Sequence, residues 1–122
     1  MILADTSVWI DHFRSGNKEL QTTLNQGRIV IHPYIVAELA LVSLKDRIKT
    51  LAMFDLLPQV RVAQTAELRL MIEARHLYSL GIGLTDAQLL ASVFISPPAL
   101  LWTKDRRFRK VAEALGVHAN LP

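Results

Sequence analysis

The chain has 122 residues, of which 51% are hydrophobic and 20% are charged, so it has enough apolar material for one compact domain over residues 1–122 and is not a disordered chain. It contains no cysteine, which excludes disulfide frameworks, cysteine-ligated zinc and thiol catalysis. Its net charge of +3 permits a polyanionic partner without requiring one.

Short apolar runs alternate with helical patterns along the chain. In chain order, the pattern predicts a strand at residues 2–4, helices at 6–14 and 17–26, a strand at 28–31, helices at 33–42 and 44–57, a short strand at 60–62, helices at 65–80 and 85–95, a strand at 99–102, a helix at 105–115 and the start of a terminal strand at Val117. Strands separated by helices are typical of an α/β fold, in which a parallel β-sheet is flanked by α-helices on both faces. Such a three-layer fold places its functional site at the carboxyl ends of the strands.

Nothing in the sequence predicts a targeting or membrane segment. The N-terminus, Met1 to Asp5, lacks the basic region of a signal peptide. The longest apolar run, at 89–95, is far shorter than the roughly 20 residues that a membrane-spanning helix needs. We therefore expect a cytoplasmic protein that does not enter a membrane.

Two acidic residues follow predicted strands. Asp5 comes directly after the strand at 2–4, and Asp105 follows the strand at 99–102. Because parallel strands end at the same edge of a sheet, the two carboxylates are predicted to lie at one edge. Aspartate is also a preferred N-cap and helices follow both positions, so a capping role for either residue remains an alternative.

Two further acids border apolar helix faces. The neighbours of Glu38 at three and four residues along the chain are all apolar or aromatic, so no cation is within reach along the helix. A carboxylate on such a face needs a partner or loses its charge. Asp86 opens the predicted helix at 85–95, next to Leu89 and Leu90. The alternatives are a hydrogen-bonded structural role for Glu38 and a capping role for Asp86.

Four acids therefore stand apart from the ordinary surface pairs: Asp5, Glu38, Asp86 and Asp105. Two like charges about 4 Å apart repel each other by roughly 4 kcal/mol at an effective dielectric constant near 20. Carboxylates that converge in this way need a cation if they are all to stay ionised. A ligand set made only of oxygen atoms suits Mg²⁺ or Mn²⁺ rather than zinc. The sequence thus predicts a magnesium site in which Mn²⁺ can substitute.

The surroundings of these acids resemble the motifs of the PIN-domain ribonucleases, most closely the VapC toxins of bacterial toxin–antitoxin pairs. The similar segments cover essentially the whole chain in order: residues 5–11, 32–39, 84–91 and 101–108. Gln88, Leu89 and Leu90 stand where the third motif of the family often carries a second acid. The resemblance implies a PIN-like fold, Mg²⁺-dependent endoribonuclease activity, a homodimer and inhibition by a VapB-type antitoxin.

Residue roles are carried over from this resemblance as expectations. Asp5, Asp86 and Asp105 are expected to hold the metal ion. Glu38 is expected to complete the catalytic set by binding a water ligand or positioning the nucleophile. Three hydroxyl residues are expected to orient these carboxylates: Thr6, Ser7 and Thr103. An RNA substrate is expected to contact the five cations beside Asp105, for which a solvated helix surface is the alternative: Lys104, Arg106, Arg107, Arg109 and Lys110.

Two other functions remain open from the sequence. The first is a non-catalytic RNA-binding or regulatory module on the same fold, although a protein that only binds polyanions gains nothing from four acids. The second is another metal-dependent phosphohydrolase. Other chemistries fit poorly, because the four histidines show no ligand spacing. The segment from Gly81 to Gly83 is also too short for a dinucleotide-binding loop and follows a helix rather than a strand.

Overall fold

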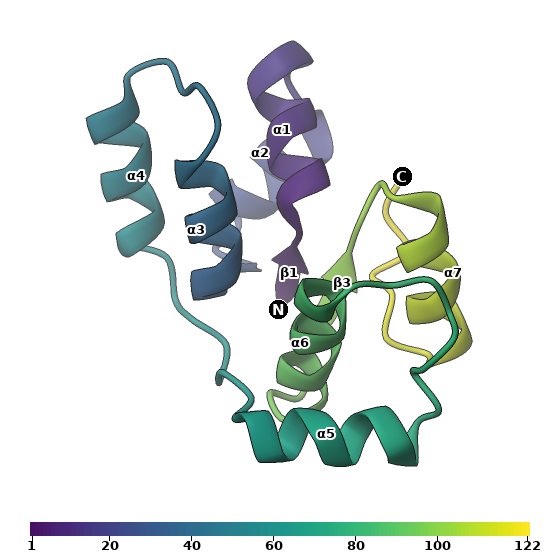
Figure 1. The fold of residues 1–122 in the computed structure, drawn as a ribbon. Coiled ribbons are helices and arrows are strands. Elements are labelled where there is room, and N and C mark those ends of the chain that lie inside the picture. Colours follow the sequence, from purple (N-terminus) through teal and green to yellow (C-terminus); the bar gives the residue numbers. More distant parts are fainter.

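A small parallel β-sheet lies at the centre of the computed structural model, which describes residues 1–122 (Figure 1). Its strands are β1 (Ile2–Ala4), β2 (Ile29–Val30) and β3 (Leu100–Trp102), in the spatial order β2-β1-β3. Seven helices surround the sheet: α1 (Thr6–Ser15), α2 (Lys18–Asn25), α3 (Pro33–Ala40), α4 (Arg47–Asp55), α5 (Thr65–Ala74), α6 (Leu84–Phe94) and α7 (Arg106–Ala114). The predicted α/β fold with a parallel sheet is confirmed.

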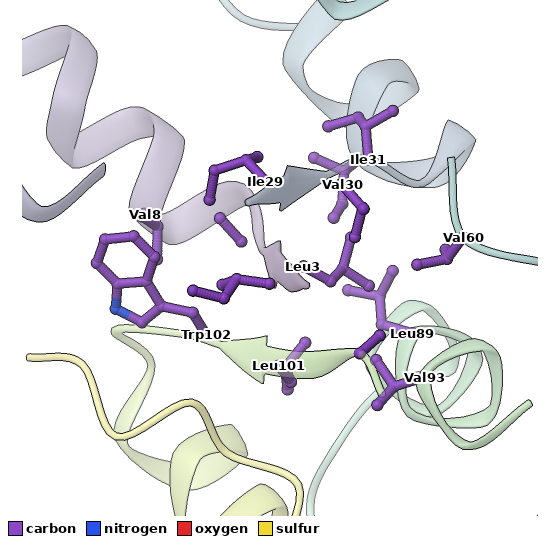
Figure 2. Close-up of a cluster of buried hydrophobic side chains, with 14 of the residues drawn as sticks. Leu3, Val8, Ile29, Val30, Ile31, Val60, Leu89, Val93, Leu101 and Trp102 are labelled. Atoms are coloured by element: carbon purple, nitrogen blue, oxygen red, sulfur yellow. The ribbon is translucent and has the colours of Figure 1, made fainter. Parts of the chain in front are cut away.

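Burial of apolar side chains explains why such short strands form. Leu3 in β1 lies opposite Val30 of β2 and Leu101 of β3 in the ladder. Figure 2 shows the side chains of all three strands meeting in one cluster, together with Leu89 and other residues of α6. Leu3 and Leu101 have no exposed surface, and each fully buried leucine stabilises the fold by roughly 1.5–3 kcal/mol. The core therefore fixes the positions at which β1 and β3 end.

The predicted helix at 65–80 is six residues shorter in the structure, because α5 ends at Ala74. His76 adopts the left-handed conformation with φ of 52°. Leu77 then donates its N–H to the carbonyl of Ile72 at 2.9 Å and buries its side chain in the core. This is a Schellman ending, which usually has glycine at the left-handed position. Because histidine occupies that position here, no glycine marks the end of α5 in the sequence.

One other helix boundary and two predicted strands are also wrong. The helix expected at 44–57 begins only at Arg47, whose guanidinium hydrogen-bonds the carbonyls of Ala40 and Val42 and so holds the preceding segment against the end of α3. The strand expected at 60–62 is a single bridge between Gln59 and Ile31. The terminal strand expected at Val117 is likewise one bridge, between Leu101 and His118. Both segments run beside the sheet too briefly to form a ladder.

No helix in the structure has both the length and the apolar content required to cross a membrane.

Candidate active site

The pairing of β1 with β3 brings Asp5 next to Thr103. Ala4 lies opposite Trp102 in the ladder, so the residues that follow these two leave the sheet side by side. The Thr103 hydroxyl donates to Oδ2 of Asp5 at 2.6 Å, and the Asp5 N–H donates to the Trp102 carbonyl at 2.9 Å. Asp5 is only 6% exposed. A buried carboxylate thus occupies the carboxyl edge of the sheet.

Asp5 and Asp105 both cap helices, so the capping role considered as the alternative for each residue is present in the structure. Oδ1 of Asp5 accepts the N–H groups of Ser7 at 3.0 Å and Val8 at 3.4 Å, together with the Ser7 hydroxyl. Oδ1 of Asp105 accepts the N–H of Phe108 at 2.9 Å. Capping uses only Oδ1 of Asp105, whose side chain is exposed and whose Oδ2 forms no hydrogen bond within the protein. The cap role therefore leaves this second oxygen available to a ligand.

Glu38 and Asp86 reach the same edge from α3 and α6. Oε1 of Glu38 accepts a hydrogen bond of 2.8 Å from the Thr6 hydroxyl, one residue beyond Asp5. Partial burial, together with the charges of Asp5, Asp105 and Glu38, raises the pKa of Asp86 to about 6. Burial also raises the pKa of Asp5. Three acids from separate parts of the chain therefore act on Asp86 through space.

These acids do not form a ready coordination sphere, since no three His, Cys, Asp or Glu side chains stand in an arrangement that would hold a metal ion. The donor set nevertheless fits a hard divalent cation, because it offers only oxygen atoms. The pKa of Asp86 is raised by its burial and by the charges of Asp5, Asp105 and Glu38, so a cation beside it would favour its ionised form. Asp86 is half-buried and Asp105 is exposed, so both side chains have room to turn toward a cation.

A cavity of about 330 Å³ opens beside Asp86 and Asp105 and is also lined by Arg106 and Arg107. Neither arginine forms an ion pair, as the two ion pairs of the protein involve other residues. The guanidinium groups therefore do not neutralise the carboxylates beside them. A pocket with both signs of charge can hold a cation on its acidic side and an anion on its basic side.

The other predicted RNA-contacting residues do not line this pocket. Lys104 lies 3.7 Å from a carboxylate oxygen of Asp11. Arg109 lies 3.6 Å from Glu113 and donates to the carbonyl of Leu121 at 2.9 Å. Lys110 is exposed and makes no ion pair.

Sequence reasoning missed Gly81, which forms the wall of the pocket opposite α7. Its φ of +76° favours glycine, and a Cβ atom at this position would lie 2.6 Å from Nη1 of Arg107. Nη1 of Arg107 also approaches the Gly81 carbonyl at 3.4 Å. Because Gly81 has no side chain, the guanidinium of Arg107 has room to lie over this residue. The closely spaced Gly81 and Gly83 before an acid-bearing helix were the available signal.

The affinity for Mg²⁺ is expected to rise as the pH rises through about 6. Without metal, Asp86 retains its proton up to that pH, and a coordinating carboxylate must lose it. Below this pKa the association constant should fall by about tenfold for each pH unit. Calorimetric titration with Mn²⁺ across this range measures the dependence, with Asp86→Asn as the control that lacks the titrating group. Equal affinity on both sides of pH 6 would contradict the assignment.

The metal-free protein should show the opposite trend in stability. Because the pKa of Asp86 is raised from 3.8 to about 6, the folded state binds the proton more tightly than the unfolded state. Its contribution to the free energy of unfolding is complete below pH 3.8 and is lost as the pH rises through about 6.

A parallel sheet with an acidic cluster at its carboxyl edge, flanked by helices, defines an α/β domain of the PIN type. The sequence matches the PIN domain over residues 2–114. It is 38% identical over 117 residues to Ribonuclease VapC32 of Mycobacterium tuberculosis, in strains CDC 1551 / Oshkosh and ATCC 25618 / H37Rv, and the match covers 96% of this chain and 94% of each relative. The chain belongs to the PIN-domain family and, within it, to the VapC ribonucleases. The resemblance noted in the sequence is thereby confirmed.

Proposed function

We propose that this protein is a Mg²⁺-dependent endoribonuclease that acts in the cytoplasm as the toxin of a VapBC-type pair. The observation that carries the proposal is the gathering of four acids at the carboxyl edge of the sheet, where burial and the charges of Asp5, Asp105 and Glu38 raise the pKa of Asp86. The toxin role, a VapB-type antitoxin and a homodimer are proposed only because the chain belongs to the VapC family.

Asp5, Asp86 and Asp105 would hold the metal ion, directly or through water. When bound, a divalent cation lowers the pKa of a water molecule and neutralises charge on phosphoryl oxygens. The hydroxyls of Ser7 and Thr103 hold Asp5 in place from two sides. Fixed partners of this kind orient a ligating carboxylate and limit its alternatives.

Glu38 would position the attacking water. Its Oε1 is occupied by the Thr6 hydroxyl, whereas Oε2 makes no hydrogen bond within the protein and is free to accept one from water. Thr6 thus fixes the orientation of the carboxylate, and Glu38 supplies the acceptor.

The products of cleavage test the reaction class. Hydrolysis by an activated water leaves a 5′-phosphate and a 3′-hydroxyl, whereas attack by the ribose 2′-hydroxyl leaves a cyclic 2′,3′-phosphate. We expect the first pair of ends from a defined RNA in Mg²⁺ or Mn²⁺, and no cleavage in EDTA. Cleavage that persists in EDTA or yields cyclic ends would overturn the metal-dependent mechanism. Binding of RNA without cleavage under any of these conditions would favour the non-catalytic module.

Arg106 and Arg107 are expected to bind RNA phosphates, whereas Lys110 on the same helix is not. Their guanidinium groups line the acidic pocket without an acidic partner. Alanine at either arginine should weaken binding of single-stranded RNA and reduce the slope of log K against log salt concentration by about 0.7. Fluorescence anisotropy in an Asp5→Asn background measures binding without cleavage. Lys110→Ala is the matched control, and an equal loss in this variant would show that the pocket has no special role.

A further inference from the structure

A buried hydrogen bond connects α3 to α6. The His32 ring caps α3, because its Nδ1 accepts the N–H of Tyr34 at 3.0 Å. Its Nε2 lies 3.1 Å from the hydroxyl of Ser92, which is in the last turn of α6. Neither His32 nor Ser92 has any exposed surface. Because Nδ1 is an acceptor, Nε2 carries the proton and donates it to Ser92.

The Ser92 hydroxyl is fully used by its surroundings. It accepts the N–H of Ala63 at 3.0 Å and donates to Oε1 of Gln88 at 3.3 Å. Gln88 in turn donates from Nε2 to the carbonyl of Ala63 at 2.8 Å. Gln88 therefore turns inward to support Ser92, although the corresponding segment of the family often carries an acid. A buried network in which each polar group has a partner specifies one arrangement of the elements it joins.

The two helices that this bond joins also carry two of the four acids. In Figure 1, α3 and α6 run in opposite directions. Glu38 follows His32 by six residues along α3, and Asp86 precedes Ser92 by six residues along α6. Six residues of helix span about 9 Å. For antiparallel helices, a contact between His32 and Ser92 therefore brings Glu38 and Asp86 to the same level along the helix axes.

We propose that the hydrogen bond between His32 and Ser92 is a register pin, which sets the axial position of α3 against α6 and so keeps Glu38 level with Asp86. His32 and Ser92 are positioning residues, because neither reaches the acidic pocket. The consequence for catalysis rests on the proposed function, whereas the effect on helix register does not. The influence of the Glu38 charge on Asp86 is consistent with this placement.

Two variants remove this hydrogen bond, each by changing one of its two partners. In His32→Asn, the amide oxygen can still cap α3, but the shorter side chain does not reach Ser92. In Ser92→Ala, the cap is untouched and the acceptor is lost. We expect each variant to bind Mn²⁺ about tenfold more weakly in RNA-free calorimetry and to lower kcat by at least about tenfold. In a Glu38→Gln background, the same substitutions should have little further effect on kcat, since the misplaced group is already absent.

Thr23→Ala is the matched control for a buried hydroxyl. Thr23 lies on α2 and donates to the carbonyl of Glu19 at 2.8 Å, away from α3 and α6. Its loss should lower Tm without changing the Mn²⁺ affinity or kcat of the folded protein. If His32→Asn and Ser92→Ala behave in the same way, or if their effects on kcat multiply with that of Glu38→Gln, the pin is refuted.

A crystal structure of each folded variant separates this inference from the proposed function. A displacement of α3 along α6 supports the pin even if the wild-type protein neither binds Mn²⁺ nor cleaves RNA, which would refute the proposed function alone. An undisplaced α3 overturns the pin whatever the activity.

Discussion

Asp5→Asn is expected to reduce the rate of RNA cleavage by at least about a hundredfold while the protein stays folded. Asparagine caps helices about as well as aspartate, and its Oδ1 can still accept the N–H groups of Ser7 and Val8. The Thr103 hydroxyl can rotate to accept from the new amide. The substitution removes the negative charge that a cation requires, so it should lower the cleavage activity while the protein still folds.

Cleavage of a defined RNA in excess Mg²⁺ or Mn²⁺ measures this loss, with circular dichroism to verify folding. Asp11→Asn is the matched control, because it makes the same chemical change on α1 at a residue that bonds Asn17 and lies near Lys104 instead. That variant should retain most of the wild-type activity. Cleavage by Asp5→Asn at the wild-type rate would remove Asp5 from the mechanism.

Millimolar Mg²⁺ or Mn²⁺ is expected to raise the Tm of the wild-type protein. An ion at 100 times its Kd stabilises the folded state by about 2.7 kcal/mol, which for a chain of this size raises Tm by on the order of 10 °C. Glu38→Gln should be more stable than the wild type without metal, because it removes one of the charges that repel Asp86. Because Asp5, Asp86 and Asp105 remain in this variant, its Tm should still rise with either ion, but by less than that of the wild type, which has one more negative charge at the site.

Differential scanning calorimetry with and without the ions tests both statements. Glu73→Gln provides the control, since Glu73 is an exposed acid on α5 that forms no ion pair. This variant should show the wild-type response to metal. The absence of a Tm shift with either ion in the wild-type protein would count against the whole acidic site.

The edge of the sheet was predictable because its signals are local. Apolar runs at 2–4 and 99–102 defined β1 and β3, and the rule that parallel strands end at one edge brought Asp5 and Asp105 together. The end of α5 was not predictable, because a histidine instead of a glycine adopts the left-handed conformation there. The left-handed conformation of His76 allows Leu77 to be buried in the core, and no local pattern in the sequence reveals this burial.

Long-range contacts account for the rest of what the sequence left open. The five cations beside Asp105 form one cluster in the sequence. In the structure, Arg109 donates a hydrogen bond to the carbonyl of Leu121, whereas Arg107 lies over Gly81. His32 and Ser92 are 60 residues apart, and each alone is an ordinary buried polar residue. Such partnerships are fixed by the packing of helices on the sheet, so only the folded structure identifies them.

A crystal structure of the protein soaked in Mn²⁺ would show whether the acids at the carboxyl edge of the sheet hold a metal ion. We expect anomalous density between Asp5, Asp86 and Asp105, with carboxylate oxygens about 2.0–2.2 Å from the ion. The side chains of Asp86 and Asp105 should have rotated toward the ion from their positions in the metal-free protein, whereas Asp5 should keep its bonds to Ser7 and Thr103. Density elsewhere, or none at these carboxylates while the same protein cleaves RNA in Mn²⁺, would contradict a metal-dependent reaction at this edge of the sheet.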